Sequence, residues 1–201
     1  MKKKKELEVR KMLKKLAEIL LDSMQKNITL QYEVEIYQFG LEGLLSYLLG
    51  LSIQMVFCLY SGYWLETLLF IVFFESMRVF VGGYHATTYL RCNITYLGVY
   101  VIFCWVIQLK VAIFLYVSFL IIAILVIVVK APVEHEHRPV NQQARKASQK
   151  ASRSLLIVFI MASFGLSFQY PLFSKIIGYT IILNAAMMVI ALYVKLRKKA
   201  R

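Results

Sequence analysis

The stretch Ile94–Val129, ITYLGVYVIFCWVIQLKVAIFLYVSFLIIAILVIVV, is apolar almost throughout and has one clear polar interruption, at Gln108–Lys110. A single transmembrane helix needs roughly 17–25 apolar residues. The stretch is too long for one such helix, so it predicts a tight hairpin of two membrane spans, at about 94–108 and 111–129. The whole chain agrees, because 60% of its residues are hydrophobic and 17% are charged, whereas about a quarter are charged in a soluble domain.

Further apolar runs flank this hairpin on both sides. Polar turns divide them, at Ser61-Gly62 before the hairpin and at Gln169–Pro171 after it. We therefore predict an all-α integral membrane protein with about six transmembrane helices. Since no repeat or low-complexity linker interrupts the chain, we expect one membrane-embedded domain over residues 1–201. The remaining spans are predicted at about 43–60, 63–80, 154–170 and 176–194.

Residues 1–30 precede the first span and contain a predicted amphipathic helix at about 2–26. Basic and acidic side chains occupy the surface beside an apolar stripe. This arrangement suits a helix that lies on the inner membrane surface, and it also fits a soluble helix that packs on its own protein. The stripe consists of residues three to five positions apart: Leu7, Met12 or Leu13, Leu16, Leu20 and Met24.

The chain carries a net charge of +13, and its basic residues are clustered. A polar loop is predicted over 130–153, and the tail 195–201 is basic. With both termini inside, all of the 24 Lys and Arg residues except Lys110 and Lys175 lie on the cytoplasmic side. Cytoplasmic loops collect Lys and Arg, which also meet anionic lipid headgroups. We therefore expect a lipid bilayer, and no nucleic acid, as the partner of this charge.

The segment Arg78–Cys92, RVFVGGYHATTYLRC, joins the second and third predicted spans. A thiol and an imidazole are the smallest set that performs nucleophilic acyl chemistry, with His85 as base and Cys92 as nucleophile. Only the thiolate is a strong nucleophile, and Arg78 and Arg91 supply positive charge that favours it. Because the segment is predicted to face the cytoplasm, Cys92 should be a free thiol.

The spacing of His85 and Cys92 sets a geometric condition. On a straight helix the two side chains would share a face but lie about 10 Å apart along the axis. A hydrogen bond needs about 3 Å. The pair therefore requires a bend between Gly82 and Cys92, which the Gly82-Gly83 pair permits. The alternative is a polar turn in which neither residue reacts.

The pattern Arg-x-x-x-Gly-Gly-x-His-Ala-x-x-x-x-x-Cys in this segment resembles the active-site motif of the accessory gene regulator B family. Its members are integral-membrane cysteine endopeptidases of quorum sensing in Gram-positive bacteria. The resemblance extends to the amphipathic start, to Gly40–Glu42 and to the loop Ala131–Pro139. It implies that His85 is the catalytic histidine and Cys92 the nucleophile. Arg78, Gly82 and Gly83 match further positions of the motif.

The resemblance also implies the reaction. Such enzymes cleave the C-terminal part from a small pheromone precursor peptide and keep the N-terminal part as an acyl-Cys thioester. An internal Cys or Ser of the peptide then closes a thiolactone or lactone ring. Exclusion of water from a membrane-rimmed site would disfavour hydrolysis of the thioester. A homodimer and a multi-pass location in the bacterial cell membrane are implied as well.

Four further side chains are candidates for supporting the site. Glu75 and Glu42 are candidates for orienting the imidazole, and Glu75 lies three residues before Arg78, at a spacing that permits an ion pair. Arg145 and Lys146, in the predicted polar loop, are candidates for binding an acidic segment of the precursor.

No cofactor or metal is predicted. Cys58 and Cys104 lie in apolar runs and are expected to act as small hydrophobes. Three cysteines without a C-x-x-C pair predict neither a disulfide nor a zinc framework. His135-Glu136-His137 offers two imidazoles at i and i+2, which are usually solvated in a loop.

Three other functions fit parts of the pattern. A non-enzymatic transporter or exporter would place polar residues along the middle of several spans, whereas the ionisable groups here gather at the cytoplasmic rim. A glutamate-type or metal-type membrane protease, using Glu75 and His85, would stay active without Cys92. A structural scaffold would need neither His85 nor Cys92.

Overall fold

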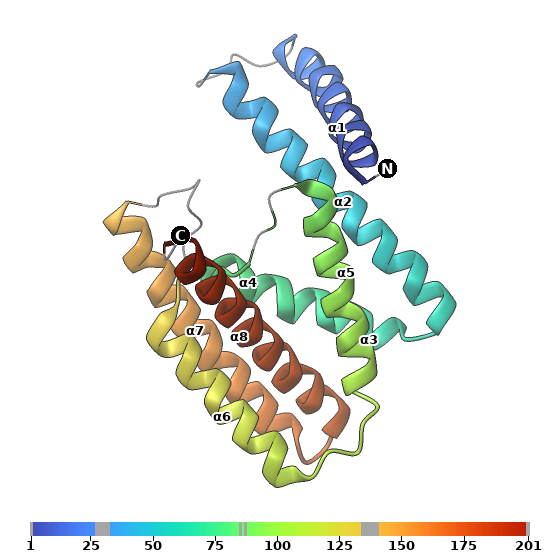
Figure 1. Cartoon of the computed structure of the whole chain (residues 1–201). Helices are drawn as coiled ribbons and strands as arrows, with labels where there is room; N and C mark the ends of the chain where they lie inside the picture. The colour runs from blue at the N-terminus through green and yellow to red at the C-terminus, as the bar shows by residue number, and fades with distance from the viewer. Residues whose placement is uncertain (1, 27–32, 85, 87, 134–140, 200–201) are drawn as a thin grey trace. The chain divides into compact units, whose positions relative to one another are not determined.

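The computed structural model describes residues 2–26, 33–84, 86, 88–133 and 141–199 of the chain (Figure 1). The described residues are mainly helical, and their one β-type pairing is an isolated bridge between Gly82 and Val133. The elements in order are α1 (Lys2–Gln25), α2 (Val34–Ser61), α3 (Trp64–Phe70), the π turn η1 (Ile71–Glu75), α4 (Ser76–Val81), α5 (Tyr89–Val106), α6 (Ile113–Lys130), α7 (Gln142–Leu166) and α8 (Pro171–Lys199).

The prediction of an all-α membrane protein is confirmed at the level of its helices. The helices α2, α5, α6 and α8 are long and apolar enough, by length and composition, to cross a membrane. The predicted span 63–80 coincides with α3, η1 and α4, where the π turn divides the helix into short pieces. The span 154–170 coincides with the second half of α7, whose first half is polar. A total of six spans stays a prediction.

The predicted polar loop over 130–153 is wrong in its second half. Helix α7 begins at Gln142, because Asn141 caps it and the following residues are good helix formers. The Asn141 side-chain oxygen accepts a hydrogen bond from the Ala144 backbone N–H at 2.7 Å. Arg145 and Lys146 therefore lie in the first two turns of a helix and not in a loop.

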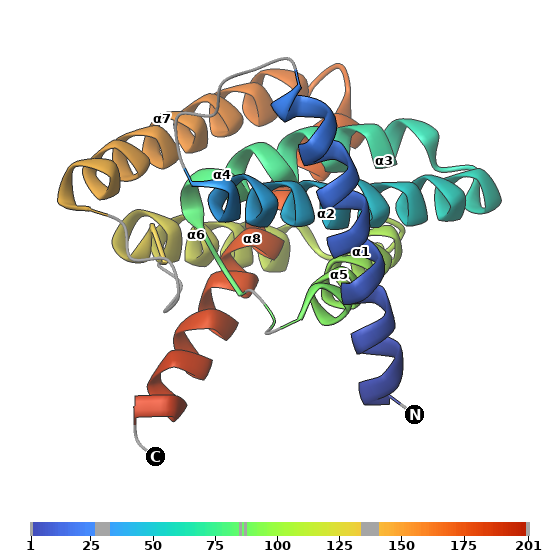
Figure 2. The ribbon, with the colours of Figure 1, turned by 90° about the horizontal axis from the view of Figure 1, so that it is seen from above.

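The described residues form two compact units. The first unit contains residues 1–61 and 86–98. In this unit α1 lies against α2 (Figures 1 and 2). The buried residues of α1 are Leu13, Ala17 and Leu21, one turn apart. The leucines predicted to form the apolar stripe only partly match them, because Leu7 and Leu16 are exposed.

The second unit contains residues 62–85 and 99–201 and is built around α8. Helices α6 and α7 lie along α8, and α3, η1 and α4 also contact it (Figure 1). Figure 2 shows that the last turns of α8 project beyond α6 and α7. The apolar core of the unit consists of Met77, Val81, Ala123, Ile127, Ala131, Leu156, Phe159, Ile177, Ile181, Ala185 and Met188.

The outer faces of these helices are as apolar as their core. Helix α6 buries Ala123 and Ile127 and exposes large side chains such as Phe114, Phe119 and Leu125. A soluble monomer rarely exposes apolar patches of this extent. Lipid tails are as apolar as leucine, so a bilayer accepts such a surface. The packing therefore agrees with the membrane class that composition predicts.

Candidate active site

The Gly-Gly pair of the motif forms a turn that only glycine allows. Helix α4 ends at Val81, and Gly82 follows with φ 73° and ψ −162°. A side chain on Gly82 would also bring a Cβ atom 2.4 Å from the Val133 carbonyl oxygen. The Val133 backbone N–H donates to the Val81 carbonyl at 3.0 Å, so the segment after α6 is bound to the end of α4. The chain therefore turns at Gly82, beside Val133. The bend that would bring His85 to Cys92 stays a prediction, because His85 lies outside the described residues.

The backbone of Tyr84 is held at both of its polar groups. An Arg78 Nη2 donates to the Tyr84 carbonyl oxygen at 2.8 Å. The Tyr84 N–H donates to the Met187 carbonyl of α8 at 3.3 Å. The Arg78 guanidinium carbon also lies 5.8 Å from the centre of the Phe74 ring. These contacts fix the backbone of Tyr84, the residue that directly precedes the predicted base His85 in the sequence.

Cys92 lies in the first turns of α5 and is half-buried. Its backbone N–H donates to the Thr88 carbonyl at 3.0 Å. The Thr88 hydroxyl oxygen accepts a hydrogen bond from the Arg91 N–H at 3.4 Å, as a helix N-cap does. His85 lies outside the described residues, so the His–Cys pair stays a prediction.

Arg91 has a partner that sequence reasoning missed. Its Nε lies 2.8 Å from a carboxylate oxygen of Glu6 in α1. The predicted role of Arg91, positive charge beside the thiol, is therefore shared with an ion pair to α1. Since Glu6 is far away in sequence, no local pattern could have indicated this contact.

Glu42 is half-buried in α2 and reaches the start of α5. It accepts a hydrogen bond from the Tyr89 hydroxyl at 3.4 Å. Asn93, next to Cys92, donates through Nδ2 to the Ser46 carbonyl at 3.1 Å. Tyr89 and Asn93 thus bind the first turns of α5, which carry Cys92, to α2. Sequence reasoning missed both residues, although a polar side chain in an otherwise apolar helix is a signal that could have found them.

The family comparison agrees with the motif. The family model of Accessory gene regulator B matches residues 13–192. The chain belongs to the accessory gene regulator B family. No match is found among curated proteins or among solved structures. Family membership and the apolar helices together make the chain a membrane protein of a quorum-sensing family.

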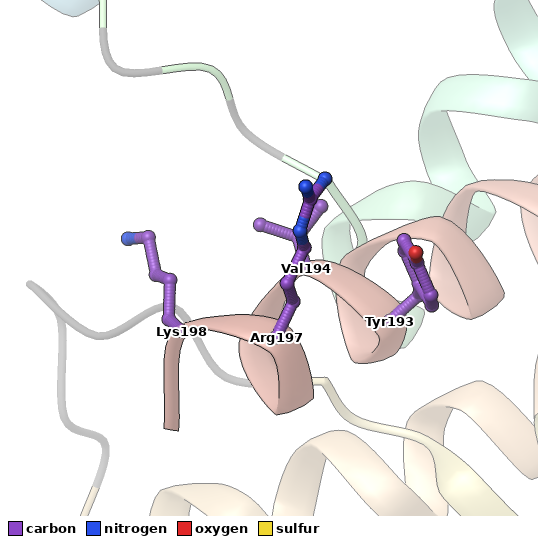
Figure 3. Close-up of a pocket in the computed structure, with 4 residues that line it drawn as sticks. All are labelled: Tyr193, Val194, Arg197 and Lys198. Carbon is purple, nitrogen blue, oxygen red and sulfur yellow. The ribbon is translucent and has the colours of Figure 1, made fainter. Parts of the chain in front are cut away.

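In this member of the accessory gene regulator B family, basic side chains lie near the start of α7 and near the end of α8. Arg145 and Lys146 are exposed in α7. Arg153, two turns later, donates to the Val128 carbonyl at 3.3 Å and so ties α7 to α6. The last turns of α8 carry a hollow of about 220 Å³ (Figure 3). It is lined by Tyr193, Val194, Arg197 and Lys198.

The remaining candidates of this accessory gene regulator B chain are placed as follows. Glu75 ends the π turn and is half-buried, one turn before Arg78. Gly83 is buried, and a Cβ on it would meet the Met187 side chain at 3.7 Å. Within the described ranges no three His, Cys, Asp or Glu side chains gather as a metal site would require. His135 and His137 lie outside those ranges.

Proposed function

We propose that this membrane protein is a cysteine endopeptidase that cleaves a small pheromone precursor peptide in quorum sensing. The observation that carries the proposal is the held turn Gly82–Tyr84. Arg78 and Met187 bind Tyr84, directly before His85, and Val133 binds the Val81 carbonyl at the start of the turn. A plain connection between two helices needs no such set of contacts. Cys92 follows in a family whose members are cysteine endopeptidases.

The chemistry follows from the two side chains. The Cys92 sulfur attacks the carbonyl carbon of the scissile peptide bond while His85 takes the thiol proton. His85 then gives this proton to the leaving amine, so the C–N bond breaks and the C-terminal part departs. The N-terminal part stays on Cys92 as a thioester. An internal Cys or Ser of the peptide attacks that thioester, which closes a thiolactone or lactone ring and restores the thiol.

The proposal includes a topology. Six spans with both termini inside place the motif and the basic end of α7 at the cytoplasmic face of a bacterial membrane. Support comes from the distribution of basic residues, of which only Lys110 and Lys175 would lie outside. The exposed leucines of α1 would then face the lipid of the inner leaflet.

The proposed partners are the precursor peptide, the bilayer and a second copy of the chain. Exposed Arg145 and Lys146 would attract an acidic segment in the part of the precursor that is cut away. The homodimer is an expectation from the family. No cofactor is required, because a thiol and an imidazole supply the whole reaction.

Single-residue variants test the mechanism. We expect Cys92→Ala and His85→Ala each to abolish cleavage of a precursor peptide by purified protein in liposomes, with membrane insertion retained. Cys58→Ala and Cys104→Ala serve as matched controls, because both cysteines are buried within helices and lie outside the motif in the sequence. They should keep most activity. Mass spectrometry of acid-quenched protein should show the acyl adduct on Cys92. Cleavage by Cys92→Ala at the wild-type rate would exclude the mechanism.

A non-enzymatic transporter is the second candidate, and one observation favours it. Gln54 in α2 is fully buried, and its side-chain amide has no partner among the described residues. Polar groups inside membrane helices are often part of a transport path. Vesicle uptake of the mature peptide by Cys92→Ala protein, lost in Gln54→Leu, would support this function.

A further inference from the structure

Asn184 is a polar residue in a place that apolar side chains could fill. It is fully buried in α8, and its neighbours along the helix include the core residues Ile181, Ala185 and Met188. Its Nδ2 donates to the Thr180 carbonyl at 3.0 Å within α8 and to the Phe74 carbonyl at 3.3 Å. The Oδ1 atom has no partner among the described residues. Burying a side-chain amide costs free energy unless its polar atoms form hydrogen bonds. The two bonds that Asn184 donates therefore need an explanation.

The acceptor Phe74 belongs to the π turn η1. Such turns are rare and wider than α-helical turns, and they occur frequently at functional sites. The Phe74 ring stacks on Phe70 at 4.8 Å between centroids and lies beneath the Arg78 guanidinium. The contact from Asn184 therefore fixes the π turn that leads into α4, the helix that carries Arg78.

Helix α8 touches the same segment a second time. Met187 follows Asn184 by three residues and so shares its helix face. Its carbonyl accepts the Tyr84 N–H at 3.3 Å, while Arg78 holds the Tyr84 carbonyl at 2.8 Å. The chain from η1 to Tyr84 is thus bound to one face of α8 at both ends, with Arg78 as the link between them.

We propose that Asn184 is a positioning residue for His85. It holds the π turn at Phe74 so that Arg78 reaches the Tyr84 carbonyl, which fixes the peptide group that leads into His85. Asn184 touches neither the substrate nor the thiol. This inference rests on the proposed function, since it needs His85 to act on Cys92.

The test uses the reactivity of Cys92 as well as cleavage. In full-length protein with Cys58→Ala and Cys104→Ala, the rate of Cys92 alkylation by iodoacetamide is measured from pH 5 to 9. A thiol paired with His85 should react at lower pH than the same thiol in His85→Ala. We expect Asn184→Leu to move the profile toward that of His85→Ala, and to lower kcat for cleavage at least tenfold with KM within about twofold.

Thr180→Val is the matched control. Thr180 is equally buried one turn away on α8, and its hydroxyl donates within α8, to the Ile177 carbonyl at 2.7 Å. Its loss should leave the profile and kcat unchanged. Asn184→Gln, which keeps a carboxamide donor, should restore part of kcat. Asn184→Ala replaces the leucine variant if that protein does not insert. Because Asn184 acts through Arg78, Arg78→Ala/Asn184→Leu should be no slower than Arg78→Ala alone.

Two results would overturn the inference, and they differ. If Asn184→Leu behaves as Thr180→Val while His85→Ala is changed, the positioning role is wrong and the proposed function stands. If His85→Ala keeps the wild-type profile and cleavage, the proposed function fails and the positioning role fails with it.

Discussion

Replacing Gly82 by alanine should damage the turn that leads to the predicted base. The backbone there has φ 73° and ψ −162°, a region that is almost confined to glycine, and a side chain in it costs about 1–3 kcal/mol. The new Cβ would also lie 2.4 Å from the Val133 carbonyl oxygen, so that backbone must move. The Val133–Val81 hydrogen bond would then weaken, at a cost of about 0.5–1.5 kcal/mol.

These terms together predict a loss of roughly 2–4 kcal/mol in the free energy of unfolding. For a chain of this size, 1 kcal/mol corresponds to about 2–4 °C in Tm, so Gly82→Ala should lower Tm by about 5–15 °C. Precursor cleavage should fall more than tenfold, since the Tyr84 backbone shifts with the turn.

The assay is thermal unfolding of purified protein in one detergent, together with cleavage in liposomes. Gly98→Ala is the matched control, because Gly98 lies inside α5 and nothing lies within 4 Å of an added Cβ. Alanine favours a helix over glycine by about 1 kcal/mol, so this variant should be unchanged or more stable. A Tm of Gly82→Ala within 1 °C of Gly98→Ala, with cleavage retained, would refute the reasoning.

Three further outcomes are expected. Gly178→Ala should destabilise the protein, because the added Cβ would overlap the Tyr116 hydroxyl oxygen. Adding Tyr116→Ala should recover part of the lost Tm. If the single and double variants melt at the same temperature, this explanation is wrong. Arg145→Ala/Lys146→Ala should lower kcat/KM for a precursor with an acidic tail severalfold at low salt and only slightly at high salt, since exposed charges are screened beyond about 8–10 Å. If kcat/KM depends neither on salt nor on the charge of the tail, these basic residues set the membrane topology and do not bind the substrate. A lone cysteine at Val140→Cys should resist impermeant thiol reagents added outside intact cells, and labelling there would reverse the proposed orientation.

Local patterns in the sequence predict most of the helices but not all of their ends. Apolar runs and turn residues such as Gly62 and Pro171 place most of the helices, because periodicity and turn chemistry act over a few residues. The prediction places the start of α7 in a loop because its first residues are polar, although Asn141 is a good helix cap. The predicted apolar stripe of α1 omits Ala17, which is fully buried. A stripe of apolar residues does not distinguish a face that protein covers from a face that lipid covers.

The partners in the site could not be predicted from sequence. The Gly pair indicates a bend, but glycine is also needed at Gly82 because the Val133 backbone lies against it. Val133 is about fifty residues further along the chain, so the local sequence does not indicate this contact. The contacts of Tyr84 with Met187 and of Arg91 with Glu6 join residues that are even more distant in sequence. Such contacts depend on how helices pack, which no spacing rule supplies.

Helix α5 has a consequence for how the sequence can change in evolution. Its first turns are tied to α2 twice, through Tyr89 and, one turn later, through Asn93. One residue inserted or deleted between these two anchors would turn Asn93 by about 100° relative to Tyr89 and move it by about 1.5 Å, so the two side chains would no longer reach α2 together. Cys92 lies between the anchors, so alignments of the family should show no gaps from Tyr89 to Asn93.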